Sequence, residues 1–332
     1  MKKTAKKRLL FVPLIAALFL ASACSFGFPN TLMNTNNPNA RWKNPSESFK
    51  ELGTIYNGFG PYYFLLFSDI HFGKKNGPSQ EEFLNFIDYH NQKVMNGEPH
   101  EDSHAATPYR FCLFLGDAAE HGEEKEFQQF AAFEKKVIEK LGEGDPSSFE
   151  RIICVLGNHD IYSKGYGYWH KYMFPGTPGF KFTTVSGGKT RSFYGTDSAS
   201  SCFGSNQLDF LEEKFTSDPN PKIFLSHEPY SQLEPENKSF MVSFDQEEKL
   251  KMMKLLFENN FDAFLSGHVH SGGITFRDET VDYTVKSFTN NGGEHSFYTI
   301  KIDEENKKAT VYRFTEETWK TGPKASYAIA LK

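Results

Sequence analysis

The sequence predicts an α/β protein: a layered αββα-type sandwich with parallel βαβ units and a C-terminal antiparallel strand region. From residue 61, short apolar runs alternate with longer amphipathic segments, which is the order that parallel strands joined by helices require. After residue 273 the helical pattern stops, and four segments alternate with the period of two that is typical of strands. The chain has 332 residues, 38% of them hydrophobic, and 34 Phe, which is enough for a sizeable core.

Each element is predicted from its own residues. The first strand, 62–68 (YYFLLFS), is a continuous apolar run, as expected for a strand covered on both faces. The first helix, 79–97, has apolar side chains at helical spacing, such as Phe83 and Ile87, after a serine cap and early acidic residues. A loop-rich section follows residue 157. The same patterns predict strands at 110–116, 151–157, 222–226 and 262–266, and helices at 123–142, 205–215 and 246–260.

The N-terminus has the pattern of a targeting segment. Five basic residues precede an apolar run at 9–20, and small residues follow at 21–23, which predicts a secretory signal peptide over residues 1–23. The apolar run is shorter than the ~20 residues that a membrane span needs. Cys24 comes next, in a context that resembles the lipobox of bacterial lipoproteins, although Ala21 stands where Leu is usual. We therefore predict lipidation of Cys24, with cleavage by an ordinary signal peptidase or an uncleaved anchor as alternatives.

These features set the expected location and domain limits. The protein is expected to be exported across the cytoplasmic membrane, to the periplasm or the cell surface, with the lipid at Cys24 as its membrane contact. Residues 24–60 include an Asn- and Pro-rich stretch without periodicity, which predicts a flexible tether after the lipidation site. One domain is expected over 61–318, followed by a C-terminal tail over 319–332.

Charge and cysteine content argue against several function classes. Removal of residues 1–23 deletes five positive charges and no negative ones, which moves the net charge from −5 to −10. General nucleic-acid binding is not expected, because it requires basic stripes. None of the cysteines has C-x-x-C spacing, which disfavours cysteine-based zinc or thioredoxin chemistry. Cys112 and Cys154 are expected to be buried thiols, with a disulfide between them as the alternative.

Residue types that bind metals collect where the predicted strands end. Because ligands of α/β sheets bind outside the carboxyl ends of the strands, these five loops should meet in one crevice. Mixed imidazole and carboxylate ligands suit Mn, Fe, Zn or Ni rather than Ca or Mg. Seven such side chains exceed the needs of one tetrahedral ion but suit two ions that share a carboxylate. The seven are Asp69, His71, Asp117, Asn158, His227, His268 and His270. His159 and Asp160 follow Asn158 in the same loop.

The motifs D-x-H, G-D, G-N-H-D, a later His and G-H-x-H occur in this order within residues 62–290. They resemble the calcineurin-like metallophosphoesterase family. The resemblance implies hydrolysis of phosphate esters by a hydroxide that bridges two divalent or trivalent metal ions. It also implies that Asp69, His71 and His270 bind one metal, that Asn158, His227 and His268 bind the other, that Asp117 bridges both, and that His159 contacts the phosphate or protonates the leaving oxygen.

The motifs narrow the substrate only in part. The segment GDAAEHG lacks the Arg of protein Ser/Thr phosphatases, His71 argues against purple acid phosphatases, and little chain follows residue 290 for the second domain of exported nucleotidases. A compact hydrolase of small phosphomonoesters or phosphodiesters remains. Two alternatives are a non-catalytic metal-binding surface lipoprotein, against which His159 argues, and a small exported nuclease, against which the acidic charge argues. Asp160 either supports Asn158 or His159, or is an ordinary loop acid.

Overall fold

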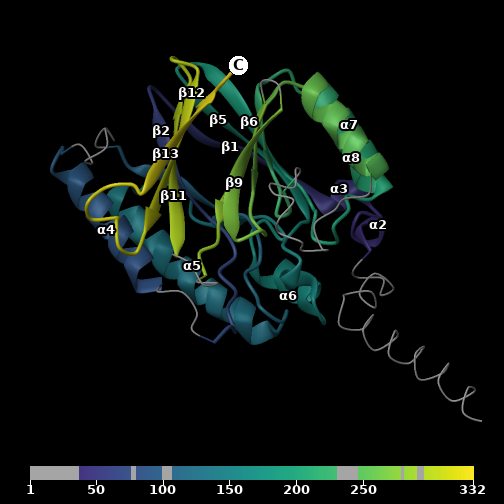
Figure 1. Ribbon diagram of the computed structural model, residues 1–332, viewed down its shortest axis with the longest axis horizontal. Helices are drawn as coiled ribbons and strands as arrows, with labels where there is room; N and C mark the ends of the chain where they lie inside the picture. Colours follow the sequence, from purple (N-terminus) through teal and green to yellow (C-terminus); the bar gives the residue numbers. More distant parts are fainter. Residues whose placement is uncertain (1–36, 76–79, 99–106, 230–245, 278–279, 290–294) are drawn as a thin grey trace, which may run out of the picture.

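Two β-sheets lie face to face at the centre of the molecule (Figure 1). The computed structural model describes residues 37–332 except 76–79, 99–106, 230–245, 278–279 and 290–294. The strands are β1 (Phe49–Gly58), β2 (Tyr62–Phe67), β3 (Tyr109–Phe114), β4 (Ile152–Cys154), β5 (Gly179–Ser186), β6 (Lys189–Gly195), β7 (Lys222–Leu225), β8 (Phe261–Ser266), β9 (Ser271–Arg277), β10 (Thr280–Lys286), β11 (Ser296–Asp303), β12 (Lys308–Thr315) and β13 (Ala325–Ala330). The six-stranded sheet has the order β13-β12-β11-β2-β3-β4, and the seven-stranded sheet has the order β1-β5-β6-β7-β8-β10-β9.

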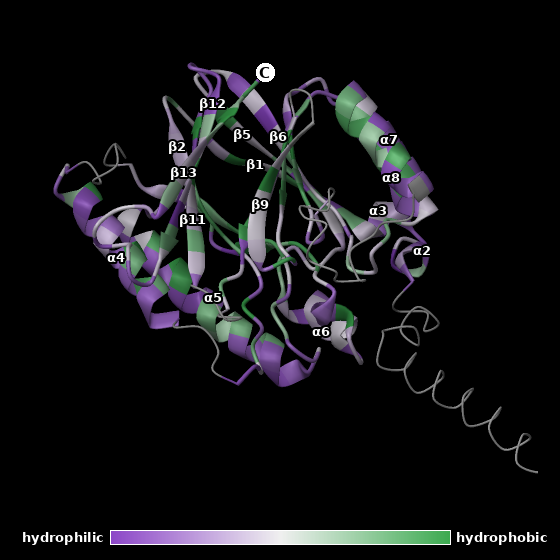
Figure 2. Ribbon diagram, viewed as in Figure 1, coloured by the Kyte–Doolittle hydropathy of each residue, from purple (hydrophilic) through white to green (hydrophobic). Residues whose placement is uncertain are grey.

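Helices cover the outer face of each sheet (Figure 1). Helices α4 (Gln80–Met95) and α5 (Glu124–Gly144) lie against the six-stranded sheet, and α7 (Ser205–Ser217) and α8 (Gln246–Glu258) lie against the seven-stranded sheet. All four helices carry both hydrophobic and hydrophilic residues along their length (Figure 2). This is the predicted αββα order of layers.

Strand β2 shows how the sequence builds these layers. Successive side chains of a strand point to opposite faces. Tyr62, Phe64 and Leu66 therefore pack between the two sheets, while the alternate residues Tyr63, Leu65 and Phe67 pack under the helices. Because both faces are covered, all six residues of β2 are buried, as its continuous apolar sequence predicts.

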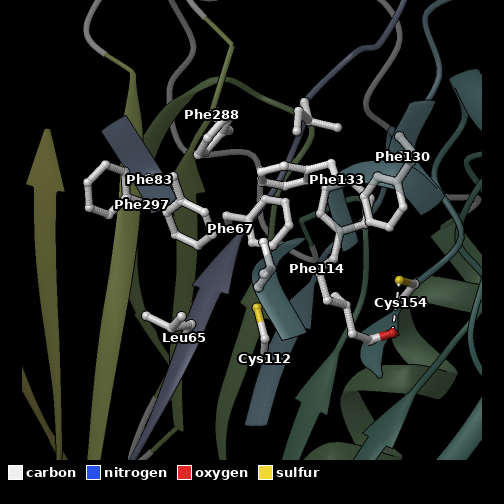
Figure 3. Packing of buried hydrophobic residues seen from close by; sticks show 14 of the residues in the cluster. Leu65, Phe67, Phe83, Cys112, Phe114, Phe130, Phe133, Cys154, Phe288 and Phe297 are labelled. Atoms are coloured by element: carbon white, nitrogen blue, oxygen red, sulfur yellow. Dashed lines mark hydrogen bonds between the residues drawn. The ribbon is translucent and has the colours of Figure 1, made fainter. Parts of the chain in front are cut away.

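Phenylalanine rings fill the interface between α4, α5 and the six-stranded sheet (Figure 3). The ring of Phe67 lies 4.8 Å from that of Phe114 and 5.3 Å from that of Phe83, between ring centroids. Such tilted aromatic pairs contribute beyond the apolar area they bury. Cys112 and Cys154 are free thiols buried in the same cluster, which agrees with the buried-thiol interpretation and not with a disulfide.

Among the strands that the sequence predicts, parallel and antiparallel pairing are divided as expected, with one exception. Strands β2, β3 and β4 are parallel, as are β6, β7 and β8. Strands β11, β12 and β13 are antiparallel. The exception is β10, which pairs antiparallel with β9 but parallel with β8.

The domain extends further at both ends than the sequence predicts. Residues 37–58 are not a flexible tether, because β1 pairs in parallel with β5 and Trp42 is fully buried. The tail is a strand as well, since β13 pairs with β12. The prolines that suggested a linker instead begin two short helices, α2 (Pro38–Arg41) and α3 (Pro45–Ser48), where a missing N–H costs nothing. The signal peptide and Cys24 lie outside the described residues.

The section after residue 157 is also more regular than expected. It contains the helix α6 (Gly165–Tyr172) and the antiparallel pair β5 and β6, which completes the seven-stranded sheet. Among the described residues, no helix combines the length and apolar character needed to cross a membrane.

Candidate metal centre

The seven predicted ligands meet at one edge of the sandwich. Strands β2, β3 and β4 come from one sheet and β7 and β8 from the other, and the loop after each carries at least one of these residues. Their donor atoms fall into two groups that share Asp117. Five loops spread over about 200 residues therefore bring their ligand-type side chains together, as the sequence predicts.

The first group is formed by Asp69, His71 and His270. His270 Nε2 lies 3.3 Å from Asp69 Oδ1 and 3.2 Å from His71 Nε2. Asp117 Oδ2 lies 3.6 Å from His71 Nε2, which brings the shared carboxylate to the edge of this group. All these atoms are contributed by side chains that are buried or nearly so.

The second group is formed by Asn158, His227 and His268. Asn158 Oδ1 lies 2.9 Å from both His227 Nε2 and His268 Nδ1. The two imidazole nitrogens are 3.2 Å apart, and Asp117 Oδ2 is 3.3 Å from His227 Nε2. His268 and His270 therefore belong to different groups although one residue separates them in the chain.

The spacing of these atoms fits metal ligation. Donors that bind one ion at about 2.0–2.2 Å lie about 3–3.5 Å from one another. Most distances within both groups are close to this, at 2.9–3.3 Å, while His71 Nε2 and Asp69 Oδ1 are 3.9 Å apart. The tautomers fit as well. His227 Nδ1 contacts the carbonyl oxygen of Leu115 at 2.7 Å, so it carries the hydrogen and Nε2 presents a lone pair. In the neutral ring that lone pair faces another acceptor, Asn158 Oδ1. A metal cation between the two atoms, or a proton on Nε2, stabilises this arrangement.

The backbone at this edge is held in an unusual conformation. Five of the seven predicted ligands have positive φ: Asp69 at 57°, His71 at 49°, Asp117 at 61°, His268 at 67° and His270 at 62°. Residues other than Gly adopt this left-handed region only at a cost, so it persists where the surrounding structure enforces it, most often at functional sites. The strained backbone positions are therefore those whose side chains face one another.

Two motif glycines are required by close approach. A Cβ on Gly116, the residue before Asp117, would lie 2.6 Å from His227 Nδ1. A Cβ on Gly267, the residue before His268, would lie 2.7 Å from Asp69 Oδ2. Both contacts are closer than real Cβ atoms show, so these glycines let loops from different strands touch.

The electrostatics favour a positive charge between the groups. Burial lowers the pKa of His227, but the carboxylates of Asp117 and Asp69 outweigh it and raise the pKa to about 10. Burial, together with the charge of His227, lowers the pKa of His268 to about 3. Burial acts to raise the pKa of Asp117, yet the surrounding imidazoles hold it well below its ordinary value. The carboxylates are therefore ionised, and they favour positive charge between the two groups, from an imidazolium or from a metal ion.

The comparisons with known proteins agree with this geometry. The sequence profile of the calcineurin-like phosphoesterase family matches residues 62–272. The chain belongs to this family. Its fold is similar to that of a dimetal phosphatase from Danio rerio, with 11% identity, a TM-score of 0.54, and coverage of 82% of this chain and 99% of that one. It is also similar to GAP50, the anchor in the inner membrane complex of Plasmodium, with 12% identity, a TM-score of 0.52, and coverage of 82% and 90%.

At these identities the two structures establish the fold alone. A comparison with curated protein sequences finds no match. Family membership, with the two ligand groups, implies a dimetal centre and a hydrolase.

His159 lies beside both groups of this calcineurin-like phosphoesterase. Its backbone N–H donates to Asp117 Oδ1 at 2.9 Å, and its Nδ1 lies 2.7 Å from the carbonyl oxygen of Glu120. Its ring centroid is 4.7 Å from that of His71, and one of its nitrogens lies within 4.8 Å of donor atoms of His71 and Asp117. The resemblance implied that His159 contacts the phosphate or protonates the leaving oxygen, and the structure brings it close to His71 and Asp117.

Asp160 supports a different part of the phosphoesterase than predicted. Its carboxylate accepts backbone N–H bonds from Asp117 at 3.1 Å, Ala119 at 3.0 Å and Gly157 at 2.9 Å. It therefore fixes the loop of the bridging carboxylate and not the side chains of Asn158 or His159. Burial and the charge of Asp117 raise the pKa of Asp160 to about 7.

Two residues of the site were missed in the sequence. Glu120 Oε2 lies 2.9 Å from His71 Nδ1, which directs His71 Nε2 toward the other ligands. Tyr162 Oη accepts a hydrogen bond from Asn158 Nδ2 at 3.2 Å. Each lies three or four residues after a predicted ligand, at Asp117 and Asn158. That proximity was the available signal, but a Glu or a Tyr in a loop is too common to be selected by it.

Proposed function

We propose that this protein is a two-metal phosphohydrolase that cleaves small phosphate esters, either phosphomonoesters or phosphodiesters. One observation carries the proposal. Two groups of donor atoms share the carboxylate of Asp117 and have the spacing of metal ligands, at an edge where the backbone is strained to bring them together. Two ions that share a carboxylate are suited to hold both the attacking and the leaving oxygen of a phosphoryl transfer.

The proposed metal sites follow the two groups. Asp69, His71 and His270 would hold one ion, Asn158, His227 and His268 the other, and Asp117 would bind both; the donor set suits Mn, Fe, Zn or Ni. When bound, the ions supply positive charge for the phosphate oxygens and lower the pKa of water, so that hydroxide is available near neutral pH. An acidic chain can then act on an anionic substrate.

His159 is the residue that we propose to protonate the leaving oxygen. Its Nδ1 must carry a hydrogen in order to donate to the carbonyl oxygen of Glu120. A second proton on Nε2 makes the ring an imidazolium, and loss of that proton to an alkoxide leaves the neutral ring still anchored through Nδ1. The bond from its backbone N–H to Asp117 fixes the distance between this ring and the shared carboxylate.

A substrate panel tests the proposal. Purified protein with Mn, Zn, Fe or Ni restored is assayed against aryl phosphates, bis-aryl phosphate diesters and single-stranded DNA, with elemental analysis of the same sample. We expect turnover of a monoester or a diester with metal present, and none after chelation. Metal binding without any turnover would favour the non-catalytic alternative, and cleavage of DNA alone would favour a nuclease.

We also propose that the protein is exported and carries a lipid at Cys24. The support is the signal-peptide pattern of residues 1–23 and the small residues before Cys24. Only residues 25–37 separate Cys24 from α2, whose Arg41 forms a buried ion pair with Asp197, with 2.6 Å between Nε and Oδ2. The Cys24→Ala variant should move from the membrane fraction to the soluble exported fraction; unchanged fractionation would contradict lipidation.

A further inference from the structure

Tyr162 forms a hydrogen bond with Asn158, one of the proposed metal ligands. It follows the short 3-10 helix His159–Ile161, and its side chain is partly exposed. Its ring centroid lies 4.7 Å from that of His159, and its Oη lies 3.2 Å from Asn158 Nδ2. Tyr162 therefore borders both the second ligand group and the proposed acid.

The bond to Asn158 fixes the direction of two groups. Since Asn158 Nδ2 donates to Tyr162, the Oδ1 atom of the same amide faces His227 and His268. The phenol oxygen accepts in this bond, so its own hydrogen is available to a further acceptor. Among the described residues, the hydrogen-bond partner of Tyr162 Oη is Asn158 Nδ2.

We propose that the Tyr162 hydroxyl donates a hydrogen bond to a phosphoryl oxygen of the substrate, which makes Tyr162 a substrate-contacting residue. This inference rests on the proposed function, because it places the phosphate between the metal groups and His159. A phenol is neutral near pH 7. It can therefore donate a hydrogen bond to an anionic oxygen. Because it carries no positive charge, it does not compete with the metal ions for the carboxylates.

The neighbouring tyrosines of α6 do not share this position. Tyr172 Oη donates to Glu124 at 2.7 Å, and the ring of Tyr166 lies under the guanidinium of Arg41, 5.8 Å from its centroid. Tyr168 packs beside Phe127, with 6.5 Å between ring centroids. Tyr168→Phe is therefore a matched control that removes a hydroxyl from the same region without touching a ligand.

The test compares Tyr162→Phe with Tyr168→Phe and wild type at saturating metal. Metal content, kcat, KM and the affinity for inorganic phosphate are measured, the last by calorimetry and as an inhibition constant. Loss of a hydrogen bond to a charged acceptor should weaken phosphate binding by about 10- to 100-fold, with full metal content. Tyr168→Phe should match wild type.

Each other outcome is decisive. Wild-type phosphate affinity in Tyr162→Phe would overturn the inference. Loss of metal, with phosphate affinity restored by added metal, would also overturn it and leave Tyr162 as a positioning residue for Asn158. If wild type binds phosphate but hydrolyses no ester, the proposed function fails, while the binding comparison still decides the role of Tyr162. If wild type neither binds phosphate nor hydrolyses any ester, both are overturned.

Discussion

Two clusters of buried charge lie at opposite ends of the sandwich, and they are built in opposite ways. One is the candidate metal centre at the carboxyl ends of β2, β3, β4, β7 and β8. The other surrounds Arg191, near the amino end of β6. Both contain carboxylates that are almost fully buried. Their partners differ.

The Arg191 cluster satisfies its own hydrogen bonds. The guanidinium donates from Nε and Nη2 to the two oxygens of Glu304, at 2.7 and 2.9 Å, and from Nη1 to Asp262. Asp262 also accepts the backbone N–H of Lys332 at 2.9 Å. Every contact joins a donor to an acceptor, which is how buried ions are tolerated.

In the metal centre, a carboxylate and an amide oxygen face imidazoles, whose nitrogens donate or accept according to their protonation. Asn158 Oδ1 points at two imidazole nitrogens, and Asp117 lies between imidazoles of both groups without a guanidinium or ammonium partner in the described residues. The backbone is left-handed at five of the seven predicted ligands, whereas none of the residues named in the Arg191 cluster has positive φ. Burial of charge does not by itself indicate function. Imidazoles and carboxylates that gather at the spacing of metal ligands, on a backbone held in a strained conformation, indicate a site built for a ligand.

The largest expected effect comes from removing the shared carboxylate. Asp117→Ala should lower kcat on the order of 1000-fold or more, because both ions and their charge on the transition state depend on it. Metal content should fall to one ion or none. The control is Asp209→Ala, whose carboxylate is 72% exposed on α7 and should behave as wild type. Wild-type metal content in Asp117→Ala would show that this carboxylate is not shared.

Breaking the other cluster should affect stability and not chemistry. Arg191→Met leaves Asp262 and Glu304 buried without a cation, which should cost about 3–5 kcal/mol of unfolding free energy. Turnover per folded molecule should stay at the wild-type level. Lys251→Met removes an exposed ion pair and should cost less than about 1 kcal/mol. Urea unfolding of the three proteins tests this contrast, and equal costs for both variants would refute it.

Within the metal centre, His159 is expected to act in catalysis and not in metal binding. His159→Ala should lower kcat on the order of 100-fold, the typical contribution of general acid catalysis. Metal content should be unchanged, because His159 lies outside both ligand sets as we propose them. Elemental analysis of the variant decides this point, since loss of an ion would make His159 a ligand.

The smallest effect concerns acid stability at the end that holds Arg191. Burial acts to raise the pKa of Asp218, but hydrogen bonds from Ser192 and Lys181 outweigh it and lower the pKa to about 2. Its ordinary value is 3.8, so this carboxylate stabilises the fold above about pH 4 and loses that effect as the pH falls toward 2. Asp218→Asn should therefore lose less stability than wild type between pH 4 and pH 2. Identical losses in urea unfolding would contradict the assignment.

The sequence predicts the layers and the ligands because both depend on local patterns. Strand β2 is recognisable from six consecutive apolar residues, and the ligand residues occur in short motifs directly after strands. Nothing local identifies β1 as a strand, since its partner β5 is over 100 residues away and most of its side chains are at least partly exposed. Its stability comes from that partner and from Trp42 packed beside it.

The finer parts of the site depend on the fold. The positive φ of Asp69 or His268 is enforced by contacts between loops, and no propensity of Asp or His requires it. The positions of Glu120 and Tyr162 follow from how the loops after β3 and β4 cross. Asp160 illustrates the same limit, because its place in the motif was evident but its partners were backbone N–H groups of another loop.

The central claim is that the end of the sandwich where imidazoles gather around Asp117 holds two ions and uses them in hydrolysis. Metal-free protein is titrated with Mn or Zn while bound metal and turnover of an aryl phosphate are measured on the same sample. We predict no activity without metal and a maximum at two ions per chain, with the second ion lost in Asp117→Ala. Full activity in metal-free protein, or no turnover at any loading, would contradict the account.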